Sequence, residues 1–187
     1  MSVDHRDRWN RRYADRQPGL FGDAPAPLLQ ALADPLERGS AVEMGCGEGR
    51  NCGYLAACGW SVTGIDFSDV AIRRATDAYS AVTFVCADVV SAALVVACDL
   101  GCAVYLHTSP AEREVWFDRL VDAIRPGGHL IYVGHAPPES DAGTRPPPED
   151  LRHDALSPLR TVRSAHDHEL EPGHRAQYDF GVLWRRV

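Results

Sequence analysis

The sequence contains no lysine, and all 19 basic residues are arginine. Schiff-base chemistry and the phosphate-binding P-loop both need a lysine amine, so both are excluded. No apolar run reaches about 18 residues, so we expect no spanning helix. The charged N-terminus lacks the apolar stretch of a secretory signal. The formal net charge of −7 disfavours nonspecific binding to nucleic acid.

The six cysteines include no C-x-x-C pair. With no secretory signal, this pattern indicates a reducing, cytoplasmic setting in which cysteines are small buried apolar residues. No tight spacing of cysteine and histidine resembles a structural zinc site, and we expect no metal.

Short apolar stretches alternate with helical patterns along the middle of the chain, which predicts a parallel sheet with helices on both faces. The clearest helix start is Ser109, an N-cap followed by Pro110 and by Glu112, which can reach back to it. Residues 125–128 are expected to end that helix. The strands expected in this region are 41–45, 61–66, 82–86, 99–105 and 129–134.

The chain of 187 residues has the length of one domain. We expect one or two helices in residues 1–40 and a core in residues 41–135. Residues 136–187 should hold a loop and then two antiparallel strands. Those two strands are expected at 160–169 and 175–186.

A strand that runs into glycines and then a helix carries the main chemical signal. Gly45, Gly47 and Gly49 follow the first strand, and Glu43 lies two positions before the first glycine. A dinucleotide-binding loop has the spacing G-x-G-x-x-G, whereas here the third glycine comes one position earlier. The Glu43 carboxylate would repel a pyrophosphate and attract an ammonium.

Two further carboxylates end the next two strands. Asp66 comes 21 residues after Gly45, where it can accept hydrogen bonds from ribose hydroxyls. Asp88 comes 22 residues later and can accept from an adenine amino group. Open α/β sheets bind ligands at the carboxyl ends of their strands, so the three acids should converge. Ammonium, ribose and adenine in that order describe S-adenosylmethionine.

The ordered motifs resemble those of class I S-adenosylmethionine-dependent methyltransferases, and they occupy residues 43–51, 62–68, 86–89 and 125–128. Within the class, the chain most resembles the tellurite-resistance/thiopurine methyltransferase-like group, through residues 9–13, 105–107 and 133–135. The resemblance implies a Rossmann-like sheet of seven strands, mostly parallel, with an antiparallel last strand.

The resemblance also assigns cofactor-binding roles to residues that follow the first three strands. The methionine end would contact Gly45, Cys46 and Gly47, the ribose and adenine would contact Asp66 and Phe67, and the adenine edge would contact Asp88 and Val89. Trp9 and Tyr13 lie on one face of a leading helix. That helix either closes over the cofactor and excludes water, or simply docks on the sheet edge.

Methyl transfer from a sulfonium chiefly requires alignment, so the fold alone identifies no catalytic residue. His107 and His135 follow the fourth and fifth strands, and either could take a proton from the acceptor or serve a local packing role. Tyr105 is expected to form a wall of the substrate site. In tellurite-methylating relatives, histidine and arginine side chains of the C-terminal hairpin approach the substrate, and the resemblance matches these to His168 and Arg175.

We therefore expect methyl transfer to a small acceptor: a thiol, a chalcogen oxyanion, a hydroxyl or an amine. A protein or nucleic-acid acceptor is disfavoured because the chain has no basic face. Two alternatives remain open. One is a non-catalytic S-adenosylmethionine-binding module on the same fold. The other, which the glycine spacing and Glu43 oppose, is a nicotinamide-dependent oxidoreductase. The oligomeric state does not follow from the sequence.

Overall fold

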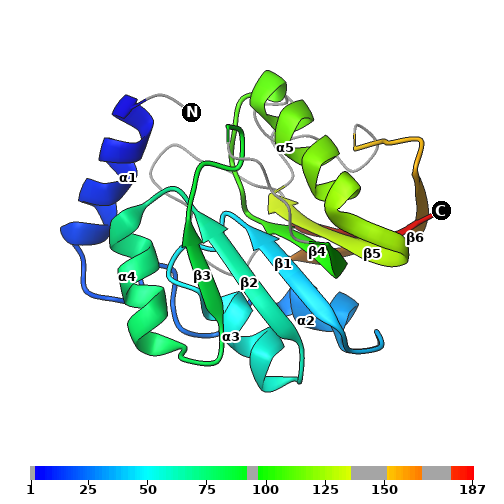
Figure 1. The fold of residues 1–187 in the computed structure, drawn as a ribbon, viewed down its shortest axis with the longest axis horizontal. Coiled ribbons are helices and arrows are strands. Elements are labelled where there is room, and N and C mark those ends of the chain that lie inside the picture. Colours follow the sequence, from blue (N-terminus) through cyan, green and yellow to red (C-terminus); the bar gives the residue numbers. More distant parts are fainter. Residues whose placement is uncertain (1–2, 92–96, 136–150, 166–177) are drawn as a thin grey trace.

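The computed structural model describes residues 3–91, 97–135, 151–165 and 178–187. One sheet of seven strands runs through them in the order β3-β2-β1-β4-β5-β7-β6 (Figure 1). The pairs among β1 to β5 are parallel, and β7 lies antiparallel between β5 and β6. The mostly parallel, seven-stranded fold with an antiparallel last strand is confirmed. Its strands are β1 (Ser40–Met44), β2 (Ser61–Asp66), β3 (Thr83–Cys86), β4 (Cys98–Val104), β5 (Ile124–His135), β6 (Leu156–Ala165) and β7 (Tyr178–Arg186).

Helices cover both faces of this sheet (Figure 1). On one face, Leu29 and Leu32 of α2 and Leu55 of α3 are fully buried in one apolar cluster. On the other face, Trp116 and Leu120 are equally buried. Each such side chain contributes about 1.5–3 kcal/mol on burial. The helices are α1 (Val3–Ala14), α2 (Pro27–Ala33), α3 (Arg50–Ala57), α4 (Asp69–Ala78) and α5 (Pro110–Ala123).

Helix α5 begins as the sequence predicts. The Ser109 hydroxyl accepts from the Glu112 backbone N–H, and the Glu112 carboxylate accepts from the Ser109 backbone N–H. The predicted end of this helix was wrong. Ile124 is already extended, with φ −76° and ψ 132°, and it opens β5 by pairing with Cys98. Residues 125–128 then bulge within the strand, where they were expected to precede it.

The C-terminal strands pair antiparallel, but β6 begins four residues earlier than the predicted 160–169 because Leu156 already pairs with Arg186. The ends of the predicted strands in 166–177, and the loop predicted at 136–148, lie outside the described residues. The predicted substrate residues His168 and Arg175 also lie outside the described residues. Within the described ranges, no helix is both long and apolar enough to cross a membrane.

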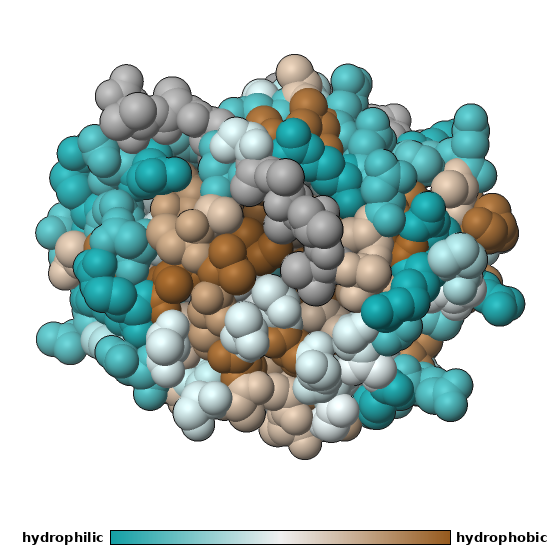
Figure 2. Space-filling model, viewed as in Figure 1, coloured by the Kyte–Doolittle hydropathy of each residue, from teal (hydrophilic) through white to brown (hydrophobic). Residues whose placement is uncertain are grey.

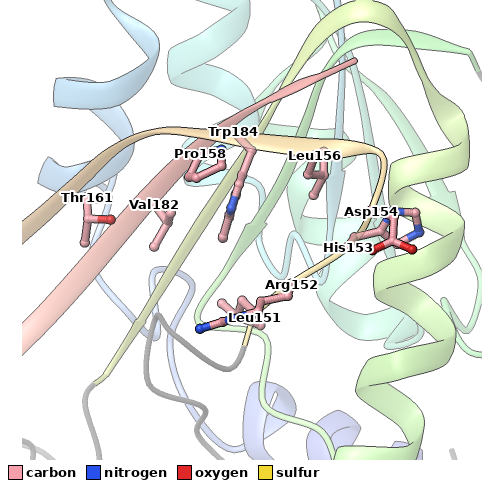
Figure 3. Close-up of a pocket in the computed structure, with 9 residues that line it drawn as sticks. All are labelled: Leu151, Arg152, His153, Asp154, Leu156, Pro158, Thr161, Val182 and Trp184. Atoms are coloured by element: carbon pink, nitrogen blue, oxygen red, sulfur yellow. The ribbon is translucent and has the colours of Figure 1, made fainter.

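A cavity of about 660 Å³ lies on the α5 side of β6 and β7 (Figure 3). Leu151, Leu156, Val182 and Trp184 supply its apolar lining, and the Trp184 ring points toward Leu151 and Arg152. Trp184 lies five residues along β7 from Asp179, about 16 Å at 3.3 Å per residue. Val182 and Trp184 both lie an odd number of residues from Asp179 along β7, so the cavity that they line is on the opposite face of the sheet from the Asp179 side chain.

Candidate active site

The glycine loop that joins β1 to α3 has a left-handed backbone at three positions. The φ angles of Gly45, Gly47 and Gly49 are 73°, 53° and 83°. A Cβ atom at Gly45 would lie 2.7 Å from Leu106 Cδ1, and one at Gly47 would lie 2.8 Å from Tyr13 Oη. Backbone conformation and close contacts both require glycine here, because other residues strain at positive φ.

Asp66 ends β2 and reaches this loop. Its Oδ2 atom accepts from the Gly47 backbone N–H at 2.9 Å, and its Oδ1 atom accepts from the Ser68 backbone N–H at 2.9 Å. The residue is 6% exposed. Burial raises the pKa of its carboxyl, against the opposing effect of these hydrogen bonds. Each oxygen of a carboxylate has two lone pairs, so Asp66 can accept from two further hydroxyls.

Glu43 is almost fully buried, at 1% exposure, and its carboxylate holds the start of α3. Asn51 Nδ2 donates to Oε1 at 2.8 Å, and the Cys52 thiol donates to Oε2 at 2.9 Å. Asn51 Oδ1 in turn accepts from the Ala26 backbone N–H at 2.9 Å. Burial raises the pKa of Glu43 to about 7. Sequence reasoning missed Asn51 and Cys52 as partners of this acid.

Asp88 lies just beyond β3, which neighbours β2 in the sheet. Its Oδ1 atom accepts from the Val90 backbone N–H at 2.9 Å. Val89 is buried, and so is Phe67, whose ring centroid lies 5.6 Å from that of His5 on α1. Asp66 is the last residue of β2 and pairs in register with Cys86, the last residue of β3, so Asp88 lies two residues beyond that pair. The three predicted acids thus occupy three adjacent strands, near their carboxyl ends.

Cys46 lies within the loop and is buried. Burial raises the pKa of its thiol to about 11, so the thiol stays protonated at neutral pH. A lining role fits this group better than a nucleophilic one, because the thiolate is the reactive form of cysteine.

Helix α1 lies beside α4, on the side to which the arrows of β1 and β2 point (Figure 1). Asn10 connects the two helices: it donates to Asp69 at 2.6 Å and accepts from the Ser68 hydroxyl at 2.6 Å. Tyr13 is buried against Gly47, and its ring centroid lies 5.8 Å from that of Trp9. The structure thus places Tyr13 against the glycine loop, with the Trp9 ring beside it.

Apolar residues are exposed in the middle of the face shown in Figure 2, over the β2–β3 part of the sheet. The outer surfaces of α1 and α4 beside them are hydrophilic. Val85 on β3, at 39% exposure, is one of the large exposed apolar side chains of the protein.

A second group of site residues gathers where β4 and β5 end. The Tyr105 ring stacks on His135 at 4.5 Å between centroids, and His107 approaches His135 edge-on at 5.5 Å. No sequence signal had singled out Asp179, which contacts both Tyr105 and His135. It accepts from the Tyr105 hydroxyl at 3.0 Å and lies 2.6 Å from His135 Nδ1. Its place follows from β7, which sets Asp179 directly opposite His135.

The predicted substrate residues His168 and Arg175 lie outside the described residues. In the part of the chain that the structure describes, no three histidine, cysteine or acidic side chains form a group that could hold a metal ion.

Residues 41–128 match a family model described as a methyltransferase domain. The phosphoethanolamine N-methyltransferase of Triticum aestivum is 32% identical over 114 residues, which cover 57% of this chain and 23% of that protein. The chain therefore spans less than a quarter of the length of the first curated relatives it matches.

Two other similarities extend along nearly the whole chain. A probable thiol methyltransferase 2 of Arabidopsis thaliana is 27% identical and covers 100% of this chain and 88% of that protein. The N-methyltransferase NodS of Bradyrhizobium japonicum, solved with S-adenosyl-L-homocysteine, has a TM-score of 0.78. That match is 18% identical and covers 96% of this chain and 97% of the other, and it shows the likeness of the fold.

The match of residues 41–128 to the methyltransferase-domain model and the likeness of the fold support the class I S-adenosylmethionine-dependent methyltransferase type that the sequence motifs resemble. The prediction of a class I S-adenosylmethionine-dependent methyltransferase is thereby confirmed.

Proposed function

We propose that this protein transfers a methyl group from S-adenosylmethionine to a small-molecule acceptor. The observation that carries the proposal is the arrangement of the glycine loop with Glu43, Asp66 and Asp88 on three adjacent strands, beneath the rings of α1. Similarity to methyltransferases named for phosphoethanolamine and thiol acceptors supports a small acceptor.

The residues present fit this cofactor. Asp66 retains lone pairs for two ribose hydroxyls, Phe67 flanks the adenine, and Asp88 with Val89 meets the adenine edge. Gly45, Cys46 and Gly47 line the methionine end, where the buried charge of Glu43 favours an ammonium. When bound, S-adenosylmethionine supplies a methyl group already activated on its sulfonium.

We assign residues 1–40 as a lid, residues 41–135 as the cofactor-binding core, and residues 136–187 as a loop and hairpin that complete the acceptor side. The lid role of α1 is supported by Tyr13, which lies against Gly47, and by Asn10, which anchors the helix to α4. Such a lid would exclude water from the sulfonium during the transfer.

His107, His135 and Tyr105 face the acceptor in this proposal, together with His168 and Arg175. Either of the first two histidines can serve as a base. We further propose that the protein acts in the cytoplasm on a small molecule, without nucleic acid or membrane. Its six cysteines are free thiols, which suits a reducing compartment.

A thermal-shift comparison followed by an activity assay tests the proposal. S-adenosylhomocysteine should raise the melting temperature more than NADH or NADPH does, and S-adenosylmethionine should be consumed with at least one thiol, hydroxyl, amine or chalcogen acceptor. A larger shift with the nicotinamide cofactors would revive the oxidoreductase alternative. Tight binding of S-adenosylhomocysteine without turnover of any acceptor would favour a non-catalytic binding module.

A further inference from the structure

A buried carboxylate connects a histidine and a tyrosine near the carboxyl ends of β4 and β5. The Asp179 side chain is 8% exposed, and that of His135 is 10% exposed. Asp179 Oδ1 lies 2.6 Å from His135 Nδ1, and Asp179 Oδ2 accepts from the Tyr105 hydroxyl at 3.0 Å. Both carboxylate oxygens therefore have named partners.

This arrangement selects one form of the imidazole. An ionised carboxylate only accepts, so the 2.6 Å contact requires a proton on His135 Nδ1. The Nε2 atom of the neutral ring is then the acceptor nitrogen. In other His–Asp pairs the neighbouring carboxylate likewise holds the imidazole in this tautomer and orientation.

The surroundings support this geometry from two further sides. Burial and the negative charge of Asp179 raise the pKa of the Tyr105 phenol, which keeps its hydroxyl a donor. Tyr105 has φ 53°, a conformation that residues other than glycine rarely adopt, and its N–H is held by the Val133 carbonyl at 2.8 Å. Such strained residues concentrate at functional sites. Arg50 of α3 lies within electrostatic range of this phenol and has the opposite effect on its pKa.

We propose that Asp179 is a positioning residue that presents His135 Nε2 as the general base, and that the acceptor is a protic hydroxyl, thiol or amine. This inference rests on the proposed function. The acceptor passes its proton to Nε2 while its lone pair bonds to the methyl carbon, and the carbon–sulfur bond breaks with its electron pair on sulfur. A chalcogen oxyanion that attacks through a lone pair loses no proton and has no use for this base.

The tautomer of His135 tests the positioning role without any acceptor. Long-range ¹H–¹⁵N spectra of histidine-labelled protein, assigned with His135→Gln, should show the wild-type proton on Nδ1. In Asp179→Ala the proton should move mainly to Nε2, while His129→Gln, six residues earlier on β5, should leave the His135 signals unchanged. A wild-type His135 protonated on Nε2 would overturn the proposal whether or not Asp179→Ala folds.

Turnover tests the acceptor class, with catechol, thiophenol, ethanolamine and tellurite as probes. We expect a protic probe to be methylated, with a kcat about 100-fold lower in both Asp179→Ala and His135→Gln and an unchanged KM. The His129→Gln variant should keep the wild-type rate. Turnover of tellurite alone, or of a protic probe at a rate that both variants preserve, would overturn the proposal.

Binding of S-adenosylhomocysteine distinguishes a failure of the proposed function from a failure of the role proposed for Asp179. If the wild-type protein does not bind it, the proposed function fails. If it binds and His135 is protonated on Nε2, the proposed function stands and the role of Asp179 is overturned.

Discussion

The backbone N–H of Gly47 donates to the Oδ2 atom of Asp66 at 2.9 Å, and this bond ties the glycine loop to the end of β2. The same carboxylate accepts from the Ser68 backbone N–H, which lies at the start of α4. One buried acid thus fixes the relative positions of two loops that follow adjacent parallel strands. A ligand that bridges those loops would meet a prearranged surface.

Asp66→Ala should weaken the binding of S-adenosylhomocysteine by about 1–3 kcal/mol, the range for losing one partner of a buried polar contact. That loss corresponds to about a 5- to 150-fold higher Kd by calorimetry. Asp77→Ala, on the exposed surface of α4, is the matched control and should bind like the wild type. Unchanged affinity in a folded Asp66→Ala protein would reject the ribose assignment.

Glu43 should make the stability of the protein fall as the pH rises. Burial raises its pKa from 4.5 to about 7, so between these values the folded state holds a proton that the unfolded state releases. The stabilisation is complete below pH 4.5 and is lost as the pH rises through 7. Its size is on the order of 3 kcal/mol, at 1.36 kcal/mol per unit of pKa.

Urea unfolding of the wild type and of Glu43→Gln across this pH range measures the effect. The wild type should lose this stability relative to Glu43→Gln as the pH rises. Asp66, whose pKa burial also raises, is common to both proteins and cancels in the difference. Parallel stability curves for the two proteins would contradict the assignment of the titration to Glu43.

Glu43 should also make the affinity for the cofactor depend on pH. A ligand ammonium near Glu43 favours its ionised form, so S-adenosylhomocysteine should bind more tightly as the pH rises through about 7 and should release protons. Calorimetry in buffers of different ionisation enthalpy counts those protons. Glu43→Gln should abolish the release below pH 8, and a release that persists in this variant would assign it to another group.

The parts of the fold that depend on local sequence could be predicted. The glycine loop, with its positive φ angles, and the capping box at Ser109 each involve residues only a few positions apart. The start of β5 could not be predicted in the same way. Ile124 continues the apolar pattern of α5, and only its pairing with Cys98 makes it part of the strand.

In the candidate site, too, contacts between residues far apart in the sequence could not be predicted. Glu43 could be identified by its position before the glycines, but its partners Asn51 and Cys52 depend on how α3 packs against β1. Asp179 was missed because its contact with His135 depends on the register of β7 against β5. An error of one residue in that register would turn the Asp179 side chain to the other face of the sheet.

His107→Ala should lower turnover while leaving the affinity for S-adenosylhomocysteine unchanged. His107 follows β4 and contacts the ring of His135, whereas the three acids proposed to bind the cofactor lie on or just beyond β1, β2 and β3. Steady-state rates with a methylated probe, together with calorimetry, separate the two properties. Unaltered rates would make this histidine a packing residue.

Gly47→Ala should destabilise the protein for two separable reasons. An alanine at φ 53° is strained, by about 1–2 kcal/mol for a left-handed residue. Its Cβ would also lie 2.8 Å from Tyr13 Oη. Gly59→Ala is the control for strain alone, because its φ is 95° and no atom lies within 4 Å of the added Cβ. Urea unfolding should therefore show a larger loss for Gly47→Ala than for Gly59→Ala.

Combining Gly47→Ala with Tyr13→Phe isolates the contact between α1 and the loop. Removing the phenolic oxygen removes the atom that the new Cβ would meet, so the double variant should recover the part of the loss that exceeds Gly59→Ala. Residues in contact are non-additive in this way, typically by about 0.5–3 kcal/mol. Strict additivity of the two substitutions would mean that Tyr13 does not press on Gly47 in solution, and α1 would then lose its role as the cover of the loop.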